Sequence, residues 1–242
     1  MVKRYLLLVI MLLFGKIAFA QVPAWGGNAD LQDYSFGFTF QYVNSYFKID
    51  KRPDWRKPYF DPGVNRNITD SVNSISSPGA PGFAVGFLAR YSLTDFLEIR
   101  TTPSLVFADR TLKYTYADPS QDQSKAVQST SLDLPVSFKL KSERIQDFRA
   151  YMLAGIKYSM AIGSKKNNPD IDPLDAIVRN KSGFGSYELG LGCDIYFEYF
   201  KLSPEIKISN SFGNVLIPED NPFATPISKL SLHTVTFSLI FE

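Results

Sequence analysis

Hydrophobic and polar residues alternate with a period of two along most of this chain. In the segment 148–162, for example, Phe148, Met152 and Ile156 share one face, whereas Arg149 and Lys157 lie on the other. Successive side chains of a β-strand point to opposite faces, so this pattern predicts strands. The same alternation predicts eight strands in all, at residues 35–42, 82–91, 97–108, 131–140, 148–162, 187–197, 200–212 and 234–241.

The connections between these strands alternate in length. Long connections are expected at 50–81, 118–125, 165–181 and 213–228, and short ones at 92–95, 142–147 and 198–199. Outer-membrane barrels have long loops on the extracellular side and short turns on the periplasmic side. The fold class that we predict is therefore all-β: an eight-stranded antiparallel transmembrane β-barrel with long extracellular loops and short periplasmic turns.

The side-chain sizes on the two faces favour lipid outside the barrel. The interior of eight strands is just wide enough for side chains, and the polar face carries many glycines and serines, whereas the apolar face is rich in Phe, Tyr, Leu and Ile. Aromatic residues also flank the short turns, as in an interfacial girdle. These are Tyr91, Phe96, Phe148, Phe197, Tyr199, Phe200 and Phe241. A soluble, lipocalin-like barrel is the alternative.

The N-terminus has the features of a secretory signal peptide. Lys3 and Arg4 precede an apolar run, and Ala18 and Ala20 stand at the −3 and −1 positions of an expected cleavage site. We therefore expect a signal peptide at 1–20, a periplasmic N-terminal segment at 21–33 and the outer-membrane barrel at 34–242. Removal of the signal changes the formal charge from +2 to −1, because Lys16 is lost as well.

The composition excludes several functional classes. The 242 residues include one Cys and one His, so neither a disulfide framework nor a His/Cys metal cluster is expected. Positive and negative charges are mixed along the chain, which argues against a nucleic-acid binder. We expect no enzymatic activity, no cofactor and no metal, and we expect contact with outer-membrane lipid and lipopolysaccharide.

Charged residues on the polar face of the strands are predicted to lie in the lumen. Buried charges must find a partner or water, so we expect a salt-bridged plug rather than a solute channel. The predicted network comprises Glu98, Arg100, Asp133, Lys139, Lys157, Glu188, Asp194, Glu205 and Lys207. Four further cations share this face, namely Arg90, Arg110, Arg149 and Lys201.

Several segments resemble the PorT family of outer-membrane barrels. The most specific are KLKSER at 139–144 and YFKLSPEIKIS at 199–209; FRAY at 148–151, GIKYS at 155–159 and YELGLG at 187–192 agree as well. The resemblance implies a non-enzymatic role in type IX protein secretion, in some relatives linked to gliding, together with other secretion-system proteins as partners. The alternative is a small surface barrel whose long loops bind a ligand or act in adhesion.

One short turn is a candidate docking site. Ser142, Glu143 and Arg144 are expected at the periplasmic rim, where they could contact a partner protein. A turn that is hydrogen-bonded within itself explains the same residues equally well.

Other candidates have simpler explanations. His233 is placed on the lipid face near the outer rim, and no Ser and Asp partners can be assigned to it, so a catalytic base is not expected. Asp170, Asp172 and Asp175 lack the Gly and Glu of an EF-hand, and a solvated turn is favoured. Cys193 is expected on the lipid face, where it acts as a small apolar residue. The basic and aromatic loop 51–59 could bind a partner or lipopolysaccharide phosphate, although an ordinary exposed loop is the simpler interpretation.

Overall fold

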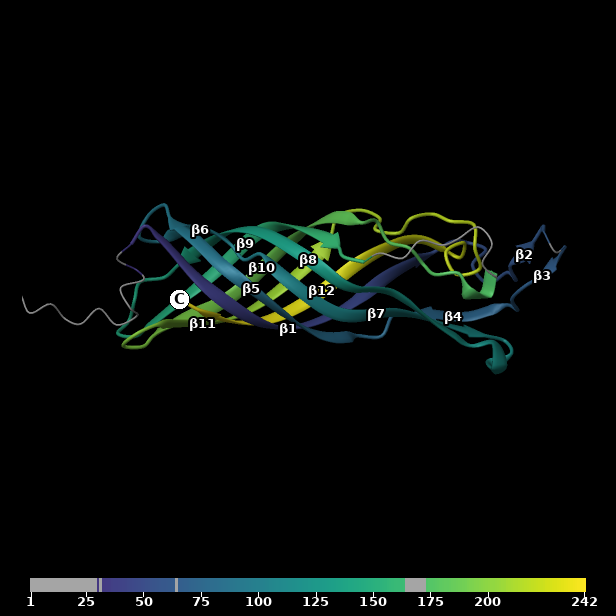
Figure 1. Ribbon diagram of the computed structural model, residues 1–242, viewed down its shortest axis with the longest axis horizontal. Helices are drawn as coiled ribbons and strands as arrows, with labels where there is room; N and C mark the ends of the chain where they lie inside the picture. The colour runs from purple at the N-terminus through teal and green to yellow at the C-terminus, as the bar shows by residue number, and fades with distance from the viewer. Residues whose placement is uncertain (1–29, 31, 64, 164–172) are drawn as a thin grey trace, which may run out of the picture.

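The computed structural model describes residues 30, 32–63, 65–163 and 173–242, which form a closed antiparallel ring (Figure 1). The ring closes where β1 (Tyr34–Lys51) pairs with β12 (Ile227–Phe241) on one side and with β5 (Ala80–Ser92) on the other. The remaining ring strands, in chain order, are β6 (Leu97–Thr101), β7 (Ser104–Tyr116), β8 (Gln123–Lys141), β9 (Phe148–Ala161), β10 (Gly183–Tyr196) and β11 (Lys201–Ser211). β6 and β7 each pair with β5 and β8, and from β8 to β12 each strand pairs with the next one in the chain.

Two of the eight positions around the ring are each occupied by two shorter strands. β4 (Val72–Ser76) and β5 form one, and β6 and β7 form the other; β7 pairs with both β4 and β5. Closure satisfies backbone donors and acceptors without a free sheet edge, as lipid requires. The predicted eight-stranded barrel is therefore confirmed.

Outside the ring lie only short elements within the described residues. These are the hairpin of β2 (Phe60–Asp61) and β3 (Arg66–Asn67) and the 3₁₀ turns η2 (Pro119–Gln121) and η3 (Pro173–Asp175). In the part of the chain that the structure describes, there is no helix with the length and hydrophobicity to cross a membrane. The expected signal peptide at 1–20 lies outside the described residues.

The predicted loop boundaries are partly wrong, because several strands run further than the alternation indicated. The expected loop 50–81 contains β4, in which Val72 pairs with Tyr116, and it contains the β2–β3 hairpin. β12 begins at Ile227 rather than 234, and β10 begins at Gly183 rather than 187. These extensions are stabilised by pairing with neighbouring strands, which a single segment of sequence does not display.

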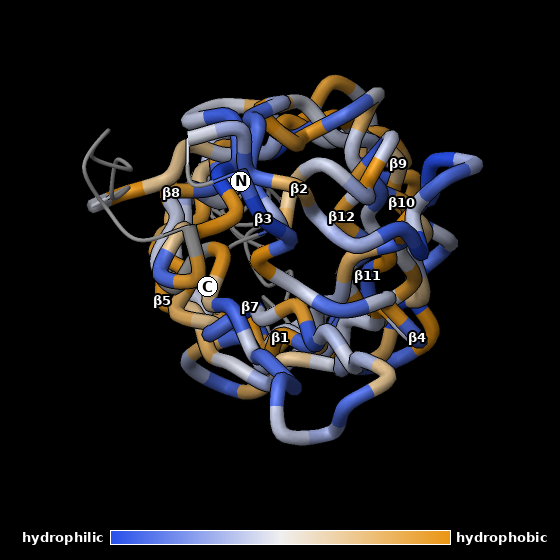
Figure 2. Tube along the Cα trace, turned by 90° about the vertical axis from the view of Figure 1, so that its right-hand side faces the viewer, coloured by the Kyte–Doolittle hydropathy of each residue, from blue (hydrophilic) through white to orange (hydrophobic). Residues whose placement is uncertain are grey.

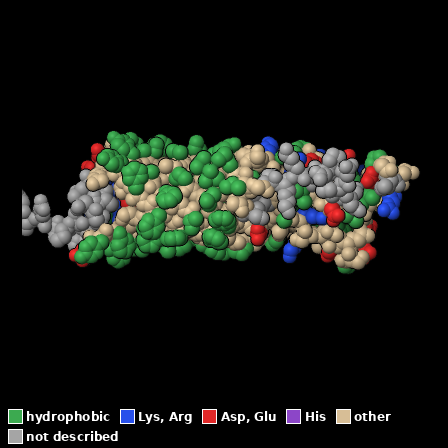
Figure 3. Space-filling view, viewed as in Figure 1, with side chains coloured by type: hydrophobic (Ala, Val, Ile, Leu, Met, Phe, Trp, Pro, Cys, Tyr) green, Lys and Arg blue, Asp and Glu red, His purple; other side chains and the backbone are tan. Residues whose placement is uncertain are grey.

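On the face shown in Figure 3, hydrophobic side chains gather over the half of the barrel that carries the short turns and the C-terminus. We call this half the membrane belt. Its outward side chains are large and exposed: Phe36, Phe38, Phe40, Tyr42, Phe83, Val85, Phe87, Phe138, Leu140, Met152, Ile156, Leu189, Leu191, Ile206 and Phe237. At the short-turn end Phe197 and Phe200 stack with ring centroids 4.8 Å apart, and both are exposed. An apolar band edged by aromatic residues is the surface that a barrel presents to lipid.

The other half of the molecule, which we call the head, has the opposite arrangement. Its strands point apolar side chains inward, and residues of the long loops cover them. This apolar core consists of Phe47, Val72, Ile75, Leu112, Tyr114, Tyr116, Ala176, Val178, Phe184, Val215, Leu216, Phe223, Ile227, Leu230 and Leu232. Charged side chains such as Lys48, Lys113 and Lys229 are exposed on the outside. Viewed along the axis from the head, the strands surround this core as a ring (Figure 2).

Candidate functional site

The lumen of the membrane belt is filled by ion pairs. Glu98 of β6 is fully buried; its carboxylate accepts a hydrogen bond from Lys141 Nζ at 2.7 Å and lies 3.4 Å from Arg90 and 3.8 Å from Lys139. Lys139 also contacts both carboxylate oxygens of Asp194, at 2.8 and 2.9 Å. Four strands therefore meet at this group of charges.

A second group of charges surrounds Glu205 on β11. Its carboxylate pairs with Arg100 and accepts a hydrogen bond from the Tyr151 hydroxyl at 2.9 Å, and Lys207 lies 3.7 Å away. Gly192 makes room for the Tyr151 ring, since a Cβ at this position would lie 2.5 Å from it. Hydrogen bonds to a buried carboxylate compensate for its lost hydration. The absence of a side chain at residue 192 thus allows the tyrosine to reach Glu205.

The periplasmic end of the lumen is closed by residues that our sequence analysis did not assign to the network. The carboxylate of Glu242 pairs with Arg90 and lies 2.9 Å from Lys201. The carboxylate of Asp30 lies 3.2 Å from Lys201. The alternation itself could have identified Glu242, because it falls on the inward parity of β12.

The Asp30 carboxyl is held in its charged form. Burial acts to raise its pKa, but Lys201 and the hydrogen bond from the Tyr196 hydroxyl outweigh burial and hold the pKa well below its ordinary value. Arg149 lies 3.3 Å from the same carboxylate. Asp30 precedes β1 and joins strands β9, β10 and β11 at the barrel end, a contact that no strand pattern could indicate.

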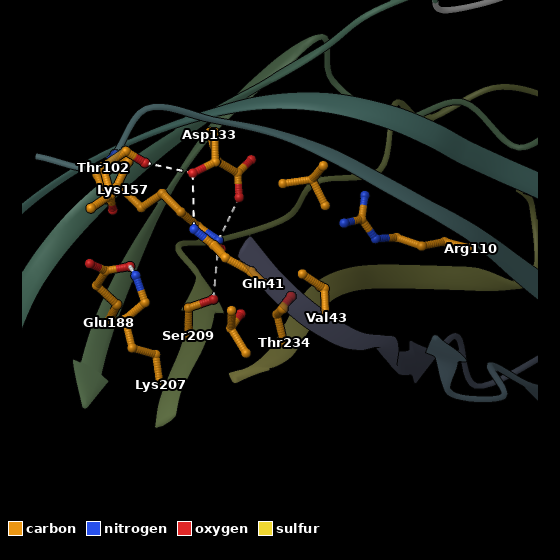
Figure 4. A pocket seen from close by; sticks show the side chains of 14 residues that line it. Gln41, Val43, Thr102, Arg110, Asp133, Lys157, Glu188, Lys207, Ser209 and Thr234 are labelled. Carbon is orange, nitrogen blue, oxygen red and sulfur yellow. Dashed lines mark hydrogen bonds and ion pairs between the residues drawn. The ribbon is translucent and has the colours of Figure 1, made fainter. Parts of the chain in front are cut away.

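A third group of charges (Figure 4) lies in the part of the lumen next to the head core, which we call the upper lumen. Asp133 and Lys157 form a pair at 2.9 Å, and Lys157 also donates to Ser209 Oγ at 3.3 Å. Lys207 lies 3.8 Å from Glu188, which accepts a hydrogen bond from Ser137 at 2.7 Å. These groups line a small pocket at the level where the lumen changes from polar to apolar.

The nine residues of the predicted network thus all lie in the lumen, in groups of which two are joined by Lys207, between Glu205 and Glu188. Glu98, Lys139 and Asp194 are linked, as are Arg100 and Glu205, whereas Asp133 pairs with Lys157. The residues that the prediction lacked are Asp30, Lys141, Tyr151 and Glu242. The predicted plug of charges is confined to the belt and its junction with the head, since the inward residues of the head are apolar and are covered by loops.

A larger pocket, with a volume of about 260 Å³, opens in the head between the segments 54–72 and 220–226. Tyr59 lies at its wall, and its hydroxyl donates to the backbone carbonyl and the carboxylate of Asp220, both at 3.3 Å. Burial, together with the nearby Asp220 charge, raises the pKa of Tyr59 to about 12. The other lining residues are Asp54, Trp55, Lys57, Pro58, Phe60, Thr69, Val72, Pro222, Thr225 and Pro226.

The candidate docking turn is hydrogen-bonded within itself. Ser142 Oγ donates to the carbonyl of Glu143 at 2.9 Å, and Arg144 Nε donates to the carbonyl of Gln146 at 2.6 Å. The Arg144 guanidinium also lies over the Tyr196 ring, 3.8 Å from its centroid. Glu143 is exposed. These contacts explain the conformation of the turn without a partner protein, and docking at this turn stays a prediction.

The remaining candidates lie apart from the lumen. Nδ1 of His233 lies 2.7 Å from Oδ1 of Asn210, and its ring is 4.9 Å from that of Tyr46. In the basic loop, Lys51 and Arg56 both lie over the Trp55 ring, at 4.0 and 5.0 Å. Asp170 and Asp172 lie outside the described residues, whereas Asp175 ends η3. Cys193 is half-buried on the outer face of β10.

The sequence of this chain matches the model of a known protein family. The model of the outer membrane protein beta-barrel domain matches residues 31–216. A comparison with curated proteins gives no match.

Similar solved structures are outer-membrane proteins. OprG of Pseudomonas aeruginosa is 11% identical, with a TM-score of 0.45 and coverage of 90% of this chain and 95% of its own. Neisserial surface protein A is 9% identical, with a TM-score of 0.43 and coverages of 86% and 98%. Ail of Yersinia pestis is 8% identical, with a TM-score of 0.38 and coverages of 87% and 98%. By its match to the family model over more than half of its length, this chain belongs to the outer membrane protein beta-barrel domain family.

Proposed function

We propose that this protein is a non-enzymatic, closed barrel that presents a ligand-binding head at the cell surface. The observation that carries the proposal is that side chains occupy the lumen in both halves, ion pairs in the membrane belt and apolar side chains in the head. An eight-stranded barrel has an interior just wide enough for such a filling. A filled lumen suits display of the head better than passage of a solute.

The 260 Å³ pocket in the head is the site that we assign to the ligand. It is close to the lower end of the range of about 300–1,000 Å³ typical of small-molecule sites. Its walls combine apolar surface, from Trp55, Tyr59 and Pro222, with the polar groups of Thr69 and Asp220. This combination fits a ligand that has both an apolar face and several hydroxyl groups.

The charges around the pocket favour a neutral ligand. Asp54 and Asp220 oppose an anion, whereas the nearby Lys57 and Arg56 oppose a cation. Lys51 and Arg56 already lie over the Trp55 ring, so that ring is not free to bind a further cation. Carboxylates accept strong hydrogen bonds from hydroxyl groups. A neutral saccharide satisfies all of these conditions.

Glycan binding by the folded, detergent-solubilised barrel tests this proposal. We expect binding of neutral saccharides that is lost on Asp220→Ala and kept on Asp118→Ala, which changes an exposed carboxylate elsewhere in the head. The same barrel in a planar bilayer should show no steady conductance. Conductance at the single-channel level would contradict the closed barrel, and equal binding by both variants would contradict the pocket.

A role in type IX secretion is a second candidate. It is supported by the resemblance of residues 139–144 and 199–209 to the PorT family, and by two side chains that project from the periplasmic turns. Ile145 is 72% exposed and Tyr199 is 82% exposed. Apolar side chains at this rim could contact a partner protein as well as lipid headgroups.

Export of cargo that carries a C-terminal sorting domain tests this second role. If Ser142, Glu143 and Arg144 form a docking turn, the double variant Glu143→Ala/Arg144→Ala should reduce export while the barrel stays folded. Glu198→Ala, in a different periplasmic turn, is the matched control. Normal export in the double variant would reject docking at this turn, and normal export after gene deletion would reject the secretion role.

A further inference from the structure

The upper lumen contains more positive than negative charge. Among the described residues, the side chains around its small pocket include three cations, Arg110, Lys157 and Lys207, but only two carboxylates, Asp133 and Glu188. Each carboxylate already has a lysine partner, at 2.9 Å for Asp133 and 3.8 Å for Glu188. The unmatched charge is therefore that of Arg110.

Arg110 is buried with no carboxylate in direct contact, and the nearest acidic group that attracts its charge is Asp133, which is already paired with Lys157. Its exposed fraction is 3%, and within the part of the chain that the structure describes no carboxylate lies within 4.0 Å of its guanidinium. Its Nε donates to Ser45 Oγ at 2.9 Å, which leaves the two terminal nitrogens available to the pocket. A buried charge without compensation is strongly destabilising, so a counterion at this position would stabilise the folded barrel.

The pocket beside Arg110 limits the size of that counterion. Its volume is about 20 Å³. About 10–15 Å³ measured in this way suffices for one water molecule, so a single small particle fits and a phosphate or carboxylate does not. Hydroxyl groups line the same space, from Thr102, Ser104, Ser209, Thr234 and Thr236. A hydroxyl group can donate a hydrogen bond to an anion.

We propose that the upper lumen binds one monatomic halide ion, chloride under ordinary conditions, between the Arg110 guanidinium and the hydroxyl-lined wall of the pocket (Figure 4). The ion neutralises Arg110, the cation of this pocket that has no carboxylate in direct contact. It lies directly below the apolar core of the head, where Leu112 follows Arg110 by two residues on the same face of β7. The site is therefore a structural anion site at the junction of the two halves.

A bromide derivative tests the site directly. The complete mature chain is folded into detergent in sodium bromide and crystallised, and anomalous scattering locates the ion. We expect one bromide peak within hydrogen-bonding reach of Arg110. An upper lumen without a bromide peak, with ordinary water density in its place, would overturn the proposal.

Anion-dependent stability provides a second measurement that does not depend on crystals. The barrel is folded in chloride or in gluconate at equal ionic strength, and the midpoint of thermal unfolding is compared. At a chloride concentration ten times the Kd we expect a midpoint about 3–6 °C higher in chloride. Arg110→Met should remove this difference, whereas Arg179→Met, in a half-buried pair with Glu219 away from this pocket, should keep it. The same midpoint in both salts for the unsubstituted chain would reject the site, even if Arg110→Met fails to fold.

Discussion

The membrane belt and the head are built from the same strands but have opposite polarity. β7 shows this within 13 residues, and its even-numbered residues face inward along its whole length. In the belt Leu105 and Phe107 point outward; in the head Leu112 and Tyr114 point inward while Lys113 is exposed. The alternation of inward and outward residues does not change between the two, although the pairing of β7 with β8 shifts register on either side of Arg110. What changes is the solvent outside, lipid in one half and water in the other.

The two halves are consequently held together by different interactions. The head is stabilised by apolar burial, at roughly 25 cal/mol per Å². The belt lumen is stabilised by ion pairs whose gain is largely offset by the cost of desolvating the charges. Burial of apolar side chains therefore adds net stability to the head. In the belt, the ion pairs mainly avoid the free-energy cost of leaving a buried charge unpaired. The following predictions test this difference, from the largest expected effect to the smallest.

The largest effect is expected from breaking a lumen pair. Glu205→Ala leaves Arg100 buried without its carboxylate and removes the acceptor of the Tyr151 hydroxyl, so we expect a loss of about 3–5 kcal/mol. Urea unfolding in detergent measures it. The double variant Arg100→Met/Glu205→Leu removes both charges and should lose much less. Equal losses in the single and double variants would show that the pair itself supplies the stability.

Removing an apolar side chain should destabilise the head but not the belt. Leu112→Ala creates a cavity in the head core, and we expect a cost of about 2–5 kcal/mol with faster proteolysis of the long loops. Leu105→Ala, on the outward face of the same strand, is the matched control, because lipid fills the space that it leaves. Similar proteolysis of both variants would mean that the head has no core of its own.

An outward charge should be tolerated in the head and not in the belt. Phe87 is 75% exposed on the outer face of the belt, and Phe87→Lys is expected to cost about 2–4 kcal/mol near the bilayer midplane. Thr115→Lys, on the outer face of the head, should change stability by less than about 0.5 kcal/mol. Folding yield into lipid vesicles and heat-modifiability on gels compare the two. A fully folded Phe87→Lys barrel would place the belt outside the membrane.

The smallest effect concerns the pH dependence of the head. The pKa of Tyr59 is raised from 10.0 to about 12, so its neutral form is favoured in the folded head. The resulting stabilisation is complete below pH 10 and is lost as the pH rises towards 12. Absorbance titration of tyrosinate should show tyrosines that titrate near pH 12, and Tyr59→Phe should reduce their number by one. Titration of Tyr59 at its ordinary pKa would show that the Asp220 contact is not formed.

The alternation of residues predicted much of the lumen and little of the head. Parity placed Glu98, Asp194 and Glu205 inside the barrel, but it could not assign Lys139 to Asp194, because those residues lie on strands β8 and β10, which are not adjacent in the ring. Asp30 could not be predicted at all, since it precedes the first strand. The loop residues Val215 and Phe223 gave no periodic signal, although both are fully buried in the head core.

The sequence by itself determined that the chain forms an eight-stranded barrel, since period-two alternation and the alternating lengths of the connections are local properties of the chain. It also determined which side chains face inward over most of each strand, because parity persists except at irregularities such as that between Ile227 and Leu230 of β12. Only the tertiary structure decided which charges pair, where Arg110 is left without a carboxylate in direct contact, and where the lumen changes from polar to apolar. Those features depend on distances across the barrel and on loops that fold over its mouth, and neither is encoded in the pattern of any one strand.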